Sequence, residues 1–522
     1  MPRTSLCIAF ALLFTSSLVA ADGWPMRSHD VRRTGRTEVN GPRSATKVWK
    51  YTAEDGALIN IEPTVTSDGV FFGTWGVIRR KTLDKRQWDK FDGKIFGLNP
   101  RTGKELWPPL HPGHTPYAYK YDKRPPTQQD KPAGKGVHWN WYNGTIEGTG
   151  CIDPVDGTMY VGRGDGTLYA VDPRRGRVKW KYLTIDPARP DDPEGGGEIV
   201  GGPLITRGGV IIFGTFAAPH RPDPPKKIRH ETNAVYGVSR AGKMLWRYPT
   251  RGTLEQVFSA PVALSPDGRT VYAATNLPDG KKPCELLALN ATTGKLSFRL
   301  EMGNRGTQDM AVGPDGRVFL VGLEQGVGFP KPFALAVNPR GRGSVAWGPA
   351  YVEGTFSKSH WAGGIALMET SGKLRDVYVS TTTHRNINAR GGQLHRVDPT
   401  SGKVTASWNP EAAKPSCVGG LSDLTLDDEG VVYVGVRGQK KTLGKAETRG
   451  RMYALRHRGK SFEVIWSYEV DGQIDWASPA IGPNGGLYFG SSDRTGHGLS
   501  LFPPAARQDV RDADPVFYGI LP

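Results

Sequence analysis

The sequence has little cysteine. Its 522 residues include four, Cys7, Cys151, Cys284 and Cys417. No Cys-x-x-Cys-His segment occurs, which argues against a covalently attached haem, and no pair of Cys-x-x-Cys segments occurs, which argues against a four-cysteine zinc site. Cys151, Cys284 and Cys417 fall in different repeats. We interpret them as small buried residues, with one disulfide and one free thiol as the alternative.

Long apolar runs are also missing, apart from one at the N-terminus. Ile8 to Phe14 follows a basic start, and Val19-Ala20-Ala21 has the small residues of a signal-peptidase site. We therefore predict a signal peptide at 1–21 and an exported mature protein, with a buried N-terminal helix as the alternative. No small residues lead into Cys7, so no lipid anchor is expected. No later stretch is apolar enough for a membrane-spanning helix.

A short pattern recurs instead, and its clearest copy runs from Gly164 to Tyr182. Residues 168–171 are expected to form a strand, Asp172-Pro-Arg-Arg-Gly176 a tight turn, and 177–182 the returning strand. An aromatic residue closes each copy at intervals of roughly 50 to 70 residues, which is typical of propeller blades with insertions. These aromatic residues are Trp49, Trp107, Trp180, Trp246, Phe298, Trp347, Trp408 and Trp466.

Trp49 has no hairpin before it, and the last copy of the pattern lacks a closing tryptophan. The segment 48–51 therefore completes the last blade, with Gly498 to Phe502 as that blade's third strand. We predict an all-β, eight-bladed β-propeller of four-stranded antiparallel blades. The expected organisation is a signal peptide at 1–21, an N-terminal arm at 22–47, the propeller at 48–503 and a C-terminal tail at 504–522.

The hairpin Leu-Tyr-Ala-Val-Asp-Pro-x-x-Gly-x-x-x-Trp at 168–180, together with Trp24-Pro-x-x-x-His-Asp30, resembles the PQQ-like repeat proteins. These are eight-bladed propellers that include the quinoprotein alcohol dehydrogenases and the BamB-type scaffold of outer-membrane assembly. The resemblance implies the fold for nearly all of the mature chain. It does not decide the function, because such rings exist with and without a quinone.

Long insertions fall where strands are expected to meet one face of the ring. Most of them are basic, whereas 186–198 carries five acids against one arginine. Residues 79–90, 119–135, 221–231 and 436–449 together carry +13 of the formal net charge of +17. Such a face attracts anionic partners. The expected binding residues are Arg79, Arg80, Lys440, Lys441, Trp139 and Trp141. An envelope protein or an anionic polymer is the expected partner, nucleic acid is not expected for an exported protein, and merely solubilising loops are the alternative.

The mouth of the central channel is the second candidate site. Polar and aromatic residues just before the innermost strands are expected to converge there: Glu62, Glu147, Glu198, Gln256, Asp309, His360, Trp361, Asp475 and Trp476. The resemblance to quinoprotein dehydrogenases implies PQQ over a calcium ion in this funnel, with a carboxylate as base. Glu147, Glu198 and Asp475 are the candidates for the carboxylate roles, and His360, Trp361 and Trp476 for holding the cofactor.

The sequence departs from those dehydrogenases in three ways. It lacks their adjacent Cys-Cys pair and their cytochrome segment, and their calcium-site motif cannot be matched residue by residue. His111 and His114 flank a Pro-Gly turn with no further ligand nearby, so no metal site is predicted. The sequence thus favours a non-catalytic, monomeric propeller scaffold without an assigned cofactor. The alternative is a PQQ- and calcium-dependent dehydrogenase of alcohols or sugars.

Overall fold

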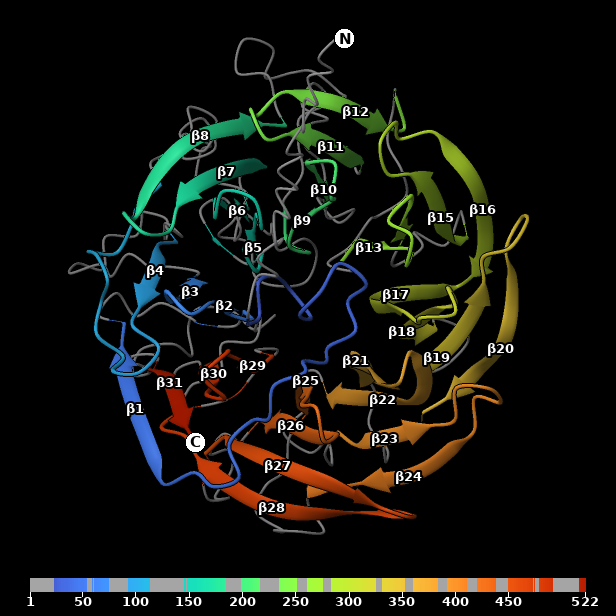
Figure 1. Cartoon of the computed structure of the whole chain (residues 1–522). Coiled ribbons are helices and arrows are strands. Elements are labelled where there is room, and N and C mark those ends of the chain that lie inside the picture. The colour runs from blue at the N-terminus through green and yellow to red at the C-terminus, as the bar shows by residue number, and fades with distance from the viewer. Residues whose placement is uncertain are drawn as a thin grey trace, which may run out of the picture.

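Eight antiparallel sheets form a closed ring around a central axis in the computed structural model (Figure 1). The described residues are 23–53, 59, 61–74, 93–112, 145–146, 148–164, 166–184, 199–215, 234–250, 261–275, 283–324, 331–352, 360–383, 392–410, 420–437, 449–472, 474, 478–491 and 516–522. We name the strand positions of each blade A to D from the axis outward. This architecture confirms the predicted fold class.

The strands of the first four blades follow in chain order. Blade 1 contains β2 (Thr64–Val65), β3 (Val70–Gly73) and β4 (Ile95–Leu98); blade 2 contains β5 (Cys151–Ile152), β6 (Met159–Gly162), β7 (Thr167–Asp172) and β8 (Arg177–Leu183). Blade 3 contains β9 (Leu204–Ile205), β10 (Val210–Gly214), β11 (Val235–Ser239) and β12 (Met244–Tyr248); blade 4 contains β13 (Ala263–Leu264), β14 (Thr270–Ala274), β15 (Cys284–Asn290) and β16 (Leu296–Gly303).

The other four blades repeat the arrangement. Blade 5 contains β17 (Arg305–Val312), β18 (Val318–Glu324), β19 (Lys331–Asn338) and β20 (Ser344–Tyr351); blade 6 contains β21 (His360–Thr370), β22 (Lys373–Thr383), β23 (Leu394–Val397) and β24 (Val404–Trp408). Blade 7 contains β25 (Leu421–Leu426), β26 (Val431–Val436), β27 (Arg451–Arg458) and β28 (Ser461–Glu469); blade 8 contains β29 (Ala480–Ile481), β30 (Leu487–Gly490), β31 (Val516–Leu521) and β1 (Lys47–Thr52).

The eighth blade joins the two ends of the chain. β1 pairs with β31 along its whole length, so that Trp49 lies opposite Gly519, and β31 also pairs with β30. The predicted closure by the N-terminal strand is thus confirmed. The third strand, however, is β31, within the range 504–522 that was expected to be a tail. That expectation was wrong for 516–521, and 498–502 lie outside the described residues.

The repeated tryptophans join each blade to the next. The indole Nε1 atoms of Trp49, Trp107, Trp180 and Trp347 donate hydrogen bonds to carbonyl oxygens in the following blade's C–D hairpin, at Pro100, Pro173, Arg240 and Pro399. The hairpin glycine packs beneath the ring: a Cβ on Gly176, whose φ is +59°, would lie 2.3 Å from Trp107. The repeated turn and tryptophan therefore form one inter-blade contact.

Blade 1 lacks a regular outer strand. Leu106 N bonds to Gly97 O, and Ile95 and Leu110 exchange two backbone hydrogen bonds, but Pro108 and Pro109 lie between these contacts. Proline has no N–H to donate and interrupts a ladder. The sheet is therefore three-stranded, with an irregular segment covering its outer edge.

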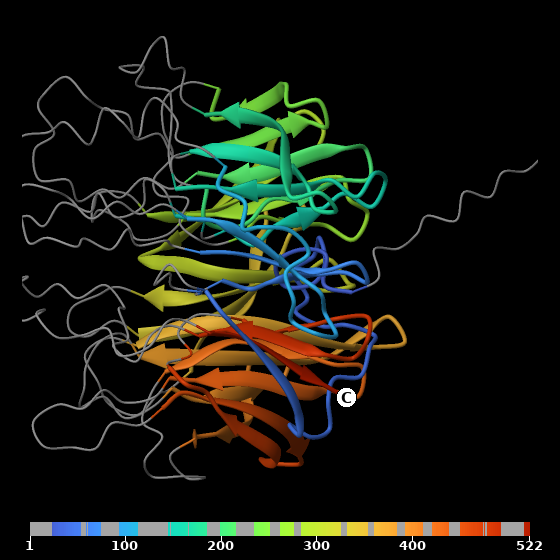
Figure 2. The ribbon, with the colours of Figure 1, turned by 90° about the vertical axis from the view of Figure 1, so that its left-hand side faces the viewer.

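The two faces of the ring receive different connections. The A–B and C–D turns are described and lie on one side, at the right of Figure 2; we call this side the turn face. The B–C and D–A connections join strand ends on the opposite side, the insertion face. The long insertions between these strand ends lie outside the described residues, so the predicted basic surface stays a prediction.

Two of the three cysteines expected in the mature protein lie among the described residues. Cys151 and Cys284 are buried, as expected, and Cys417 lies outside the described residues. In the part of the chain that the structure describes, no helix has the length and apolar character needed to cross a membrane.

Candidate functional site

The N-terminal arm, residues 23–46, crosses the axis of the ring before it reaches β1 (Figure 1). Its backbone carbonyls accept hydrogen bonds from the inner strands of six blades. The pairs are Trp24 with Val65, Pro25 with Ile152, Val31 with Leu264, Arg32 with Val312, Thr34 with Leu367 and Gly35 with Leu426, at 2.7–2.8 Å. Strand A has no neighbour on its inner edge, so these amides would otherwise lack a protein partner. The arm closes the channel at the turn face.

Arg33 is the central side chain of the arm. It is fully buried and donates to four backbone carbonyls: Val262 at 3.0 Å, Arg27 at 2.6 Å, Gly202 at 3.2 Å and Pro203 at 3.3 Å. Burial lowers the pKa of Arg33 to about 10. Its φ of +60° is in the left-handed region, as are those of Ser28 and His29. Such strain persists only where surrounding contacts hold the backbone.

Three carboxylates lie close to the strand ends that bond to the arm. Glu62, Asp309 and Asp423 lie three residues before Val65, Val312 and Leu426, the residues whose amides bond to the arm. They therefore occupy one position of the repeat in blades 1, 5 and 7. The same position holds Thr149, Gly202, Pro261, Gly364 and Ser478 in the other blades. Two buried acids and one that is partly exposed thus occupy equivalent positions around the ring.

Glu62 is held by the start of the arm. Its Oε1 accepts hydrogen bonds from Trp24 Nε1 and from Ser28 N, the latter at 2.8 Å. Trp24 is fully buried and makes an edge contact with His29, with ring centroids 5.0 Å apart. Burial raises the pKa of Glu62 to about 8. Glu62 is therefore largely protonated at neutral pH.

Asp309 and Asp423 interact electrostatically with each other. Asp309 accepts hydrogen bonds from Met310 N at 2.9 Å and Ile365 N at 3.3 Å, and burial raises its pKa. Asp423 lies 3.6 Å from Arg27, and these two side chains are 18% and 16% exposed. Burial and the charge of Asp309 raise the pKa of Asp423 to about 7. Gly364 allows the close approach, since a Cβ there would lie 2.8 Å from Asp423 Cα.

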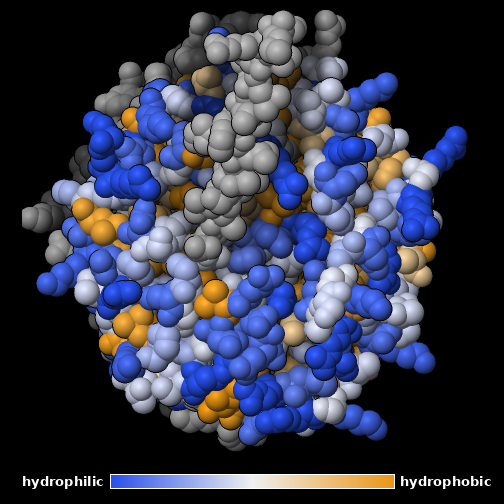
Figure 3. Space-filling model, viewed as in Figure 1, coloured by the Kyte–Doolittle hydropathy of each residue, from blue (hydrophilic) through white to orange (hydrophobic). Residues whose placement is uncertain are grey.

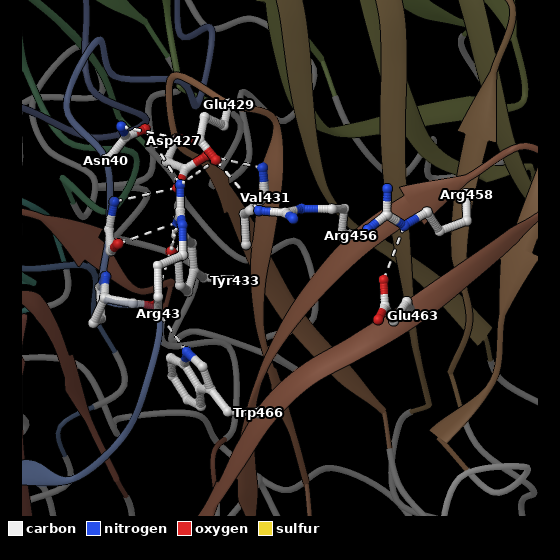
Figure 4. Close-up of polar contacts among 12 residues, drawn as sticks. Asn40, Arg43, Asp427, Glu429, Val431, Tyr433, Arg456, Arg458, Glu463 and Trp466 are labelled. Carbon is white, nitrogen blue, oxygen red and sulfur yellow. Dashed lines mark hydrogen bonds and ion pairs between the residues drawn. The ribbon is translucent and has the colours of Figure 1, made fainter.

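The end of the arm is fixed to blade 7 (Figure 4). Arg43 contacts Asp427, donates to Tyr433 Oη at 2.8 Å and pairs with Glu429 at 3.0 Å. Trp466 donates to Pro42 O at 2.8 Å. A similar arrangement joins blades 2 and 3, where Trp180 donates to Arg240 O and both Arg240 and Tyr160 donate to Asp153. Pro42 and Arg43 thus replace the C–D hairpin that the eighth blade lacks, because its fourth strand comes from the N-terminus.

The structure describes part of the predicted channel site. It places Glu62 just before β2 and Asp309 in β17, both buried, and the backbone of His360 and Trp361 at the start of β21. The other predicted residues lie outside the described residues: Glu147, Glu198, Gln256, Asp475, Trp476, Arg79, Arg80, Lys440, Lys441, Trp139 and Trp141. Asp423, Arg27 and Arg33 were missed. Asp423 could have been found from the sequence, because it occupies the same repeat position as Glu62 and Asp309.

The described carboxylates do not fit a calcium ion. Calcium takes roughly six to eight oxygen ligands, mostly from ionised carboxylates and carbonyls. Here Glu62 Oε1 and both Asp309 oxygens already accept hydrogen bonds, and Asp423 faces a guanidinium. No group of three or more His, Cys, Asp or Glu arranged to hold a metal ion occurs among the described residues. We therefore assign these acids to the contact between arm and ring.

The raised pKa of Glu62 predicts that stability falls as pH rises. The ordinary pKa is 4.5 and the folded value about 8, so between these values the folded state holds the proton more tightly. Each pKa unit corresponds to about 1.4 kcal/mol. The raised pKa values of Asp423 and Asp309 also make stability fall as pH rises, whereas the lowered pKa of His29 makes it rise. We expect the melting temperature to fall between pH 4 and pH 8.5, values that bracket this window.

Glu62→Gln isolates this effect, because the amide oxygen still accepts both hydrogen bonds but the side chain cannot ionise. The variant should lose less stability than the wild type on going from acid to alkaline pH. Glu301→Gln, at an exposed position of β16, is the control and should keep the wild-type pH profile. Identical profiles for Glu62→Gln and the wild type would contradict the assignment.

Comparisons with known proteins support the same fold. No protein-family model matches the chain. Over 227 residues it is 24% identical to a 1-butanol dehydrogenase (cytochrome c) of Thauera butanivorans, a match that spans 41% of this chain and 26% of the relative. Over 160 residues it is 24% identical to a tetrathionate hydrolase of Acidithiobacillus ferrooxidans, spanning 28% of each. The chain thus matches little more than a quarter of either relative.

Solved structures match over nearly the whole chain. A quinohemoprotein alcohol dehydrogenase from Comamonas testosteroni has a TM-score of 0.56 at 14% identity and covers 96% of this chain and 80% of its own. A europium-containing methanol dehydrogenase has a TM-score of 0.56 at 13% identity and covers 97% and 99%. BamB from Moraxella catarrhalis has a TM-score of 0.49 at 15% identity and covers 91% and 97%. The chain therefore has the PQQ-like eight-bladed propeller fold that its repeat predicts.

Proposed function

We propose that this chain is an exported, non-catalytic propeller scaffold that binds an anionic partner of the cell envelope through its insertion face. One observation carries the proposal. The long insertions join strand ends on the insertion face, while the A–B and C–D connections on the other face are short turns. Those insertions carry most of the net positive charge, and long loops on a rigid ring are where binding residues concentrate. The N-terminal segment 1–21 supports export.

The proposal is tested by reversing charge on one face at a time. The insertion-face variant changes Arg79, Arg80, Lys440 and Lys441 to Glu. The control changes Arg101, Lys243, Arg342 and Lys403 to Glu, four exposed residues of turn-face hairpins. We expect the insertion-face variant to recover fewer partner proteins from a detergent-solubilised envelope extract, and the control to match the wild type. Equal recovery by all three proteins would overturn the proposal.

A second function follows from the curated relative, a dehydrogenase that matches 41% of this chain. In this alternative the chain is a PQQ- and calcium-dependent dehydrogenase of alcohols or sugars. Glu147, Glu198 or Asp475 would provide the carboxylates, and His360, Trp361 and Trp476 would hold the quinone. When bound, the quinone would accept the two electrons released by alcohol oxidation.

Titration with PQQ and calcium separates the two functions. The quinone absorbance reports binding, and dye-linked alcohol oxidation reports turnover. We expect neither a stoichiometric complex nor turnover. A stoichiometric complex that oxidises alcohols or sugars would replace the scaffold proposal by the alternative.

A further inference from the structure

The turn face carries a circle of basic residues that the sequence analysis did not identify. Seven blades present a C–D hairpin on this face, within 99–105, 172–177, 239–244, 290–296, 338–344, 398–404 and 458–461. These hairpins hold thirteen Lys or Arg residues against three acids, Glu105, Asp172 and Asp398. Lys or Arg occurs in every hairpin, so the positive charge is distributed around the whole ring.

Most of these basic residues have no acidic partner. Four form ion pairs: Arg174 with Asp68, Arg175 with Asp172, Arg240 with Asp153 and Arg458 with Glu463. The other nine are exposed and form no ion pair with any acid among the described residues. They are Arg101, Lys104, Arg177, Lys243, Lys295, Arg340, Arg342, Lys403 and Lys460. We call these nine residues the basic rim; each of the seven hairpins contributes at least one.

The acids of the turn face do not neutralise the rim. They lie mainly in the A–B turns, nearer the axis, and several are already paired, such as Asp428 with Arg36 at 2.6 Å and Asp315 with Arg317 at 2.7 Å. Figure 3 shows this face as predominantly hydrophilic, without a large continuous apolar patch in its coloured part. The face is therefore suited to electrostatic contact rather than to insertion into an apolar phase.

The N-terminal end of the described chain lies on the same face. Trp24 pairs with Val65 at the end of β2, and a Cβ on Gly23 would contact Val65 and Pro483 beside the axis. The arm thus begins inside the circle that the basic rim forms.

We propose that the turn face docks, through the basic rim, on the surface of a bilayer that contains anionic lipids. A planar surface presents phosphate groups to all seven hairpins at once, whereas a linear anionic polymer reaches only part of a circle. Each Lys or Arg near an anionic bilayer contributes about 1 kcal/mol, screened over a Debye length. The inference goes beyond the proposed function, because it assigns a second surface and leaves the insertion face open to a partner.

Vesicle co-sedimentation tests this docking. The probes are vesicles of phosphatidylcholine alone and of an equimolar mixture with phosphatidylglycerol. We expect the mature protein to bind only the mixed vesicles, and high salt to release it. The rim variant, Arg101, Lys243, Arg342 and Lys403 to Glu, should bind at least about tenfold more weakly. The insertion-face variant, with the same change in net charge, should bind mixed vesicles as the wild type does.

The outcomes separate this proposal from the scaffold function. Loss of vesicle binding in the insertion-face variant but not in the rim variant would overturn the docking proposal. Equal vesicle binding by the wild type and both variants would also overturn the docking proposal. Binding to a soluble anionic polymer, polyglutamate, without binding to vesicles would overturn it as well. Changing the same four rim residues to Gln, with an unchanged melting temperature, excludes misfolding as the cause. Partner recovery in detergent extract is measured without vesicles, so either proposal can fail alone.

Discussion

Arg33→Met is expected to lower the free energy of unfolding by about 3–5 kcal/mol. The guanidinium is fully buried and donates to carbonyls of Arg27, Gly202, Pro203 and Val262, from the arm and from two blades. Methionine fills a similar volume but donates nothing, so these buried carbonyls lose their partner. Asp309, which interacts electrostatically with Arg33, also loses a nearby positive charge.

Chemical denaturation of the purified variant measures this loss. Arg36→Met is the matched control, because Arg36 lies in the same arm but pairs with Asp428, which is half exposed. Such a pair contributes about 1 kcal/mol or less. Equal losses for the two variants would show that Arg33 has no special role in joining the arm to the ring.

The blades could be predicted from sequence because each is specified locally. A strand, a turn with Pro and Gly, and a returning strand with a closing aromatic recur within about twenty residues, and that pattern needs no distant partner. The contact between Trp107 and the Gly176 turn of the next blade explains why the turn and the tryptophan recur together. The number of blades then follows from counting the closing aromatics.

The arm could not be predicted in the same way. Residues 23–46 show neither strand nor helix periodicity, because their conformation is set by the inner edges of six blades rather than by local propensity. An arginine in a polar segment is expected to be exposed to solvent, but Arg33 is buried. Only the complete ring provides the carbonyls that make its burial favourable.

The channel acids were predicted only in part. Glu62 and Asp309 were recognised because they precede innermost strands, and Asp423 was overlooked although it occupies the same repeat position. Their partners Trp24, Arg27 and Ser28 belong to the arm, so the pKa shift of Glu62 could not be inferred from blade sequences. The residues expected to hold a cofactor lie on connections outside the described residues, and their roles stay predictions.

The last strand was missed because it lacks the features that identify the others. β31 has no hairpin after it, since its outer partner is β1 at the other end of the chain. The Trp466 contact, made elsewhere by a C–D hairpin, is made here by Pro42 of the arm. Both ends of the chain are therefore structural parts of the ring, and the C-terminal residues are not a tail.

Truncation after residue 515 is consequently expected to abolish folding of the monomer. It removes β31, whose Phe517 stacks on Phe72 of blade 1 at 4.2 Å and whose Tyr518 stacks on Phe489 at 5.2 Å. β1 would lose β31, the strand with which it pairs in the described sheet. Trp49 would then no longer be held where its indole donates to Pro100 O of blade 1. Losing two buried aromatic side chains costs about 3–5 kcal/mol each, comparable with the whole stability of a domain.

Soluble yield, circular dichroism and size-exclusion chromatography measure the result, and deletion of Pro522 alone is the control. Pro522 is exposed and follows the last paired residue, so its removal should leave folding unchanged. Gly519→Val keeps the strand but places a Cβ 2.3 Å from the Trp49 ring, and should lower the melting temperature without abolishing expression. A truncated protein that folds with the wild-type melting temperature would show that the ring does not need β31, and that 504–522 act as a tail after all.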